Sequence, residues 1–71
     1  MPVAKIIELI GTSNQSFEDA VQQVIKRATK TLRHVSGLHI VSQKINLSEG
    51  KIVEYRVNVK VAFGIDDLKK K

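Results

Sequence analysis

The sequence predicts an α+β domain whose elements follow one another in the order β-α-β-β. Three observations predict this order: a β-branched segment opens the chain, apolar residues at helical spacing follow, and a strict apolar-polar alternation comes last. The chain has 71 residues, which is enough for one domain only. We therefore expect a single domain over 1–71, with residues 65–71 as a flexible tail.

The first predicted strand covers residues 3–10, where the sequence VAKIIELI is rich in β-branched and aliphatic side chains. Gly11 follows and predicts a turn at the end of this strand. The next residues, up to Gln15, are polar and predict a loop.

A long helix is predicted to begin after Ser16, which is a suitable N-cap with Asp19 as a weak capping-box partner. Apolar side chains then recur every three or four residues, as on one face of a helix. They are Phe17, Ala20, Val21, Val24, Ile25, Ala28, Leu32 and Val35. Arg33 and His34 fall in the last turn of this helix, where positive charge complements the helix dipole.

Two strands are predicted after the helix, which Ser36 and Gly37 end. The first runs from Leu38 to Leu47 and leads into a turn at 48–50. The second, over 51–63, alternates strictly, so that one face is apolar and the other polar. The apolar face holds Val53, Tyr55, Val57, Val59, Val61 and Phe63, and the other face holds Glu54, Arg56, Asn58, Lys60 and Ala62.

The last strand is too long for one helix to cover, so the hairpin must extend beyond the helix or curl around it. Its thirteen residues extend roughly 43 Å, whereas a helix of about nineteen residues covers about 28 Å. The chain has no cysteine for a disulfide and only two isolated histidines, so it lacks the usual means of stabilising a small domain. We therefore expect a homo-oligomer in which neighbouring subunits cover the overhanging strands.

The sequence offers no constellation that would support catalysis, and we expect a protein that is not an enzyme. His34 is interpreted as a solvated capping histidine at the end of the helix, and His39 as a surface or interface residue. Of the net charge of +5, Lys69, Lys70 and Lys71 supply three, so nucleic acid is not expected as a partner. No apolar segment is long enough to span a membrane, and the residues after Met1 do not form a signal peptide, which predicts a cytoplasmic location.

Two sets of charged residues are candidate ligand sites. Asp66 and Asp67 could bind calcium if a neighbouring subunit supplied further oxygen ligands, and Glu8, Glu54 and Asp66 are the candidate metal ligands at symmetry axes. Arg56 and Lys60 share the polar face of the last strand. They either hold a phosphate or pair with Glu54.

Several segments together resemble the sequences of one known family. The run 5–13, KIIELIGTS, and the helix start 16–21, SFEDAV, are similar to the opening of dodecins. The helix end with Thr31, Leu32, Arg33 and His34 and the last strand over 54–63 are similar as well, so the resemblance covers residues 3–65.

The resemblance implies a hollow homododecamer in which a three-stranded antiparallel sheet partly wraps one long helix. It also implies storage of flavins in pairs between subunits. In that site a tryptophan at the start of the second strand stacks on the isoalloxazine ring, and a glutamine on the third strand bonds its polar edge.

Both of these positions differ here, since Gly37 stands in place of the tryptophan and Arg56 in place of the glutamine. We therefore expect a small-ligand binding or storage protein whose flavin binding is weak or lost. Two alternatives stay open: a calcium-binding or purely structural dodecameric shell, and storage of riboflavin or FMN despite the missing tryptophan.

Overall fold

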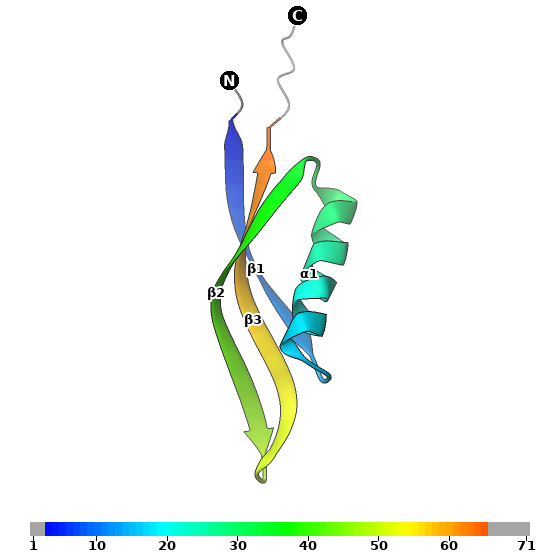
Figure 1. The fold of residues 1–71 in the computed structure, drawn as a ribbon, viewed down its shortest axis with the longest axis vertical. Helices are drawn as coiled ribbons and strands as arrows, with labels where there is room; N and C mark the ends of the chain where they lie inside the picture. Colours follow the sequence, from blue (N-terminus) through cyan, green and yellow to red (C-terminus); the bar gives the residue numbers. More distant parts are fainter. Residues whose placement is uncertain (1–2, 66–71) are drawn as a thin grey trace, which may run out of the picture.

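The computed structural model describes residues 3–65, and its elements follow the predicted order (Figure 1). They are strand β1 (Ala4–Ser13), helix α1 (Phe17–Thr31), strand β2 (Val35–Ser48) and strand β3 (Lys51–Gly64). The α+β class is confirmed. Apart from Ile65, the tail expected over 65–71 lies outside the described residues.

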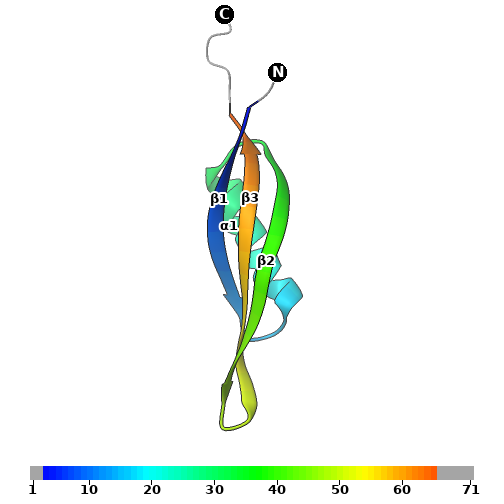
Figure 2. The same ribbon diagram turned by 90° about the vertical axis from the view of Figure 1, so that its left-hand side faces the viewer.

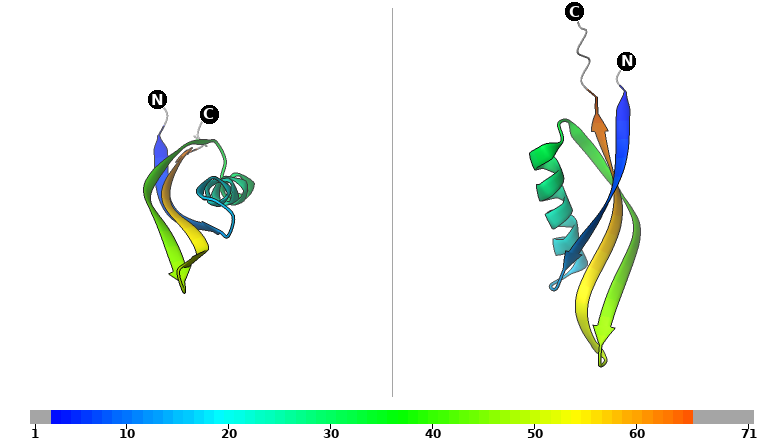
Figure 3. Two further views of the ribbon diagram at one scale, coloured as in Figure 1. Left: turned by 60° about the horizontal axis from the view of Figure 1, so that its bottom comes forward. Right: turned by 180° about the vertical axis from the view of Figure 1, so that it is seen from behind.

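The three strands form one antiparallel sheet in the order β1-β3-β2, with the helix against its concave face (Figure 3). β3 is central and pairs with β1 in regular register, from Ala4 opposite Gly64 to Ser13 opposite Tyr55. Its pairing with β2 is interrupted by three register shifts. Glu49 and Gly50 join β2 to β3 with φ angles of 51° and 79°, as a tight two-residue hairpin turn requires.

The helix begins where the sequence predicts, but its first turn is bonded differently. Ser16 is the N-cap, and its Oγ accepts a hydrogen bond from the backbone N–H of Asp19 at 2.9 Å. In a capping box the Asp19 carboxylate would accept the N–H of Ser16. It instead accepts the hydroxyl of Ser13 at 2.7 Å, which links the helix start to the end of β1.

The predicted end of the helix at Val35 is wrong, because α1 ends at Thr31. Leu32 is already extended, with φ −112° and ψ 146°, and His34 has φ 58°. Threonine favours this early end, since the Thr29 hydroxyl donates to the carbonyl of Ile25 at 2.8 Å and competes with the helix ladder. The chain then returns to the sheet, so Arg33 and His34 lie outside the helix and the basic residue of its last turn is Lys30.

Gly11 does not form the predicted turn but lies inside β1, which continues to Ser13. It is buried beneath the helix. A β-carbon at position 11 would stand 2.4 Å from Val24 Cγ2 and 2.6 Å from the carbonyl oxygen of Ala20. Glycine is therefore required here because strand and helix approach closely.

The core lies between α1 and the apolar face of β3, which confirms the predicted face of this strand. Its buried members are few within the described residues: Ala20, Val24, Ala28, Val57, Val59 and Val61. Part-buried Leu32 and Val35 pack against this core although neither belongs to the helix. So small a core indicates marginal stability for an isolated chain.

The β2-β3 hairpin extends beyond the helix, as the strand length predicts (Figure 1). Apolar side chains remain exposed on this overhang: Ile45, Leu47, Ile52 and Val53, with between 42% and 62% of their surface accessible. Within the part of the chain that the structure describes, no helix is long and apolar enough to cross a membrane.

Candidate functional site

Figure 2 shows the face of the sheet away from α1, which we call the outer face. Both ligand positions predicted from the sequence lie on this face, because Arg56 and the β3 partner of Gly37 alternate with the buried Val57, Val59 and Val61. Gly37 is opposite Ala62, and Arg56 lies between Thr12 of β1 and Lys44 of β2. Ala62 and Arg56 are six residues apart on β3, which corresponds to about 20 Å. One chain therefore does not bring Gly37 and Arg56 together, and a shared site requires more than one subunit.

Arg56 is only partly neutralised by its surroundings. Its Nη2 atom lies 3.3 Å from Oε1 of Glu54, which also accepts a hydrogen bond from Nδ2 of Asn46 at 2.5 Å. The residue directly opposite Arg56 on β2 is a second cation, Lys44. The Nε atom of Arg56 is buried and has no hydrogen-bond partner within residues 3–65. Arg56 thus pairs with Glu54, as one reading of the sequence predicts, and its Nε donor is left unpaired within the described chain.

Asn58 is a candidate residue that the sequence reasoning missed. It is the next outward-facing residue of β3 after Arg56 and lies between Ile10 and Ser42. Its Oδ1 atom is buried without a hydrogen-bond partner in the described part of the chain, and buried acceptors are seldom left unpaired. The same face of β3 therefore carries an unpaired acceptor on Asn58 and an unpaired donor on Arg56. The polar alternation of β3 placed Asn58 on this face but could not show that its amide lacks a partner.

Gly37 lies on an open part of the outer face. A β-carbon built on it meets no atom within 4 Å, and its backbone does not have a positive φ angle. A larger side chain would fit there within one subunit. The glycine therefore leaves a free surface where the resemblance implies a stacking aromatic ring.

The candidate metal ligands are separated within one chain. Glu8 lies on the outer face opposite Lys60, and Glu54 lies six residues from Lys60 along β3. Asp66 and the neighbouring Asp67 lie outside the described residues. Across residues 3–65 no three His, Cys, Asp or Glu side chains gather in a way that could hold a metal ion. A site that joins Glu8 and Glu54 would need symmetry-related copies.

The sequence and fold of this chain are similar to those of known proteins. The family model described as Dodecin matches residues 3–66. The chain belongs to the dodecin family. A dodecin from Thermus thermophilus is 35% identical over 65 residues, which cover 92% of this chain and 94% of the relative. A crystal structure of a mutant of that dodecin has a TM-score of 0.89 at 34% identity and covers 94% of this chain and 100% of the other.

A second dodecin relative has a named ligand. Calcium dodecin from Mycobacterium tuberculosis is 29% identical over 63 residues, which cover 89% of each chain. Its crystal structure is described as that of a calcium chelating antigen with a novel calcium-binding site. That structure has a TM-score of 0.79 at 28% identity and covers 97% of this chain and 99% of the other.

Proposed function

We propose that this chain is the subunit of a hollow homododecamer that binds and stores a small ligand, with flavin binding weak or lost. The observation that carries the proposal is the outer face, where Gly37 leaves open space and Arg56 keeps an unpaired buried donor. We also propose that residues 1–71 form one domain, that the protein is not an enzyme, and that it is cytoplasmic without nucleic acid as a partner.

Assembly is supported by the apolar surface that the isolated chain exposes. Ile6 and Ile10 of β1 are each 60% exposed on the outer face, and the overhanging hairpin adds further apolar side chains. Patches of this kind are typical of interaction surfaces. Light scattering should give a mass near twelve times that of the 7.9 kDa chain. A stable monomer at micromolar concentration would contradict the proposal.

Weak flavin binding is supported by the chemistry of the two substituted positions. Glycine provides no ring for stacking, and an arginine side chain can donate hydrogen bonds but not accept them. Arg56 and the facing Lys44 favour a ligand that carries an anionic group, such as a phosphate. We expect the purified oligomer to be colourless and to leave riboflavin fluorescence unquenched. Tight quenching would instead support flavin storage without the tryptophan.

Calcium binding is the second candidate function, because a relative in this family is a calcium dodecin. The candidate ligands are Glu8, Glu54 and Asp66, contributed by several subunits around a symmetry axis. Calorimetric titration with calcium tests this candidate. Saturable binding that is lost in Glu8→Gln or Glu54→Gln would favour it, and no heat in the parent protein would favour a purely structural shell over a calcium store.

A further inference from the structure

The free edge of β1 is a feature that the proposed function does not use. Because the strand order is β1-β3-β2, one edge of β1 has no strand partner within the described chain. Helix α1 packs mainly against β1 and β3 and hardly touches β2. Helix and free edge therefore lie next to each other and enclose a groove.

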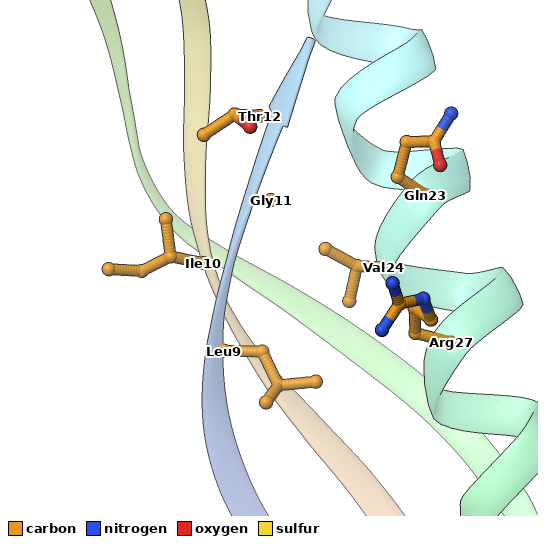
Figure 4. A pocket seen from close by; sticks show the side chains of 7 residues that line it. All are labelled: Leu9, Ile10, Gly11, Thr12, Gln23, Val24 and Arg27. Atoms are coloured by element: carbon orange, nitrogen blue, oxygen red, sulfur yellow. The ribbon is translucent and has the colours of Figure 1, made fainter.

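The groove contains a hollow of about 430 Å³ (Figure 4). One wall consists of four consecutive residues of β1, from Leu9 to Thr12. Leu9 points toward the helix while Ile10 and Thr12 point away, so the strand's main chain forms much of this wall. Pockets for small molecules typically measure about 300–1,000 Å³, and this hollow is within that range.

The opposite wall carries the cation Arg27. Gln23, Val24 and Arg27 of α1 line it, and Gln23 and Arg27 are four residues apart on one side of the helix. Within residues 3–65, no carboxylate forms an ion pair with Arg27. A guanidinium and an amide can both donate hydrogen bonds to a carboxylate or phosphate. This end of the groove is therefore suited to an anionic group.

A second hollow, of about 180 Å³, continues the groove along the same strand and helix. It shares Leu9 and Arg27 with the first hollow. Its remaining lining is mostly apolar and consists of Ile7, Ala28, Thr31 and Leu32. Arg27 thus lies between a hollow of mixed polarity and a mainly apolar one.

We propose that this groove binds a small amphipathic anion. A carboxylate or phosphate group bonds to Arg27 and Gln23, and a short hydrocarbon tail occupies the apolar hollow beside Leu9 and Leu32. The tail gains free energy from burial of its apolar surface, and the head group gains charge-assisted hydrogen bonds. Neither Arg56 nor Gly37 lines either hollow, so this site is distinct from the ligand positions on the outer face.

Calorimetric titration of the assembled full-length protein tests the proposal with four probes. Octanoate and octyl phosphate carry head and tail, inorganic phosphate carries a head alone, and octanol carries a tail alone. Both octyl anions are used below their critical micelle concentrations. They are expected to bind more tightly than inorganic phosphate or octanol, and the tighter of the two identifies the preferred head group.

Three variants locate the binding. Arg27→Gln is expected to lower the affinity for both octyl anions by about tenfold or more, which is the usual loss when a hydrogen bond to a charged group is removed. Lys26→Gln is the matched control, since it removes a neighbouring charge that lines neither hollow, and it should leave the affinity nearly unchanged. Thr31→Trp should fill the apolar hollow. It should therefore lower the affinity for the octyl anions and leave the affinity for inorganic phosphate unchanged.

Three results would overturn the proposal. The first is that neither octyl anion binds the parent oligomer at millimolar concentration, as when a neighbouring subunit covers the groove. The second is that Arg27→Gln and Lys26→Gln weaken binding equally, which would indicate attraction by general positive charge. The third is that octanol binds as tightly as octanoate, which would indicate an apolar site without anion recognition.

Discussion

Gly11 and Val24 lie so close together that a β-carbon on Gly11 would stand 2.4 Å from Cγ2 of Val24. The same β-carbon would stand 2.6 Å from the carbonyl oxygen of Ala20, which the helix backbone holds in place. Contacts this short force atoms apart. Gly11 therefore sets the distance at which α1 packs on β1, and it sets the depth of the groove between them.

Gly11→Ala is expected to destabilise the protein by about 1–3 kcal/mol, the usual range for adding a methyl group to a packed interior. Urea unfolding at one fixed protein concentration measures this change. Gly37→Ala is the control, because its new β-carbon meets no atom within 4 Å and its stability should stay unchanged or rise slightly. Equal stability of the two variants would show that the helix can move away from β1 at little cost.

Val59→Asp is expected to prevent folding, because Val59 is fully buried in the core. Burying an unpaired carboxylate there costs several kcal/mol, which is comparable to the whole free energy of unfolding of a small domain. Val57→Asp should behave in the same way, since Val57 is also fully buried. Circular dichroism of the purified variants measures the loss of secondary structure.

Val53→Asp provides the comparison on the same face of β3. Val53 is 50% exposed on the overhanging hairpin, so the variant should fold but assemble less well. Circular dichroism and light scattering separate the two effects. A Val59→Asp variant that folds and assembles like the parent would contradict the assignment of the core face.

Ser16→Ala removes the N-cap hydrogen bond to the backbone of Asp19 and should cost about 1 kcal/mol of stability. Thermal unfolding of parent and variant at equal concentration measures the loss. Ser42→Ala is the control, because Ser42 is exposed and its side chain makes no hydrogen bond within the described residues. An equal loss of stability in both variants would show that the N-cap hydrogen bond of Ser16 gives no specific stabilisation.

Gly37→Trp combined with Arg56→Gln is expected to create flavin binding. The tryptophan has room at position 37 and supplies stacking worth about 0.5–1.5 kcal/mol beyond burial. The glutamine supplies both a donor and an acceptor, and it releases Glu54 from its ion pair with Arg56. Riboflavin fluorescence titration of the parent, both single variants and the double variant measures the gain.

The gain in the double variant should exceed the sum of the two single gains, because a stacked ring positions the edge that the amide must meet. The structure places positions 37 and 56 far apart in one chain, so this coupling also reports on contact between subunits. If the parent already binds riboflavin as tightly as the double variant, Gly37 and Arg56 are not the discriminating positions.

The sequence by itself determined the features that depend on neighbouring residues. The alternation from Val53 to Phe63 identified the core face of β3, and Ser16 identified the start of α1. The length of β3 predicted the overhang beyond the helix. These predictions succeeded because the strand period, the helix period and the N-cap are local properties of the backbone.

Only the tertiary structure decided the features that depend on contacts between distant segments. Gly11 continues a strand because Val24 packs above it, and the helix ends at Thr31 so that Val35 can pair with Phe63. The order β1-β3-β2 places Asn58 between two neighbouring strands and leaves the edge of β1 beside Arg27. Spacing along the chain contains none of this information, because strand register and burial arise only when separate elements compete for the same partners.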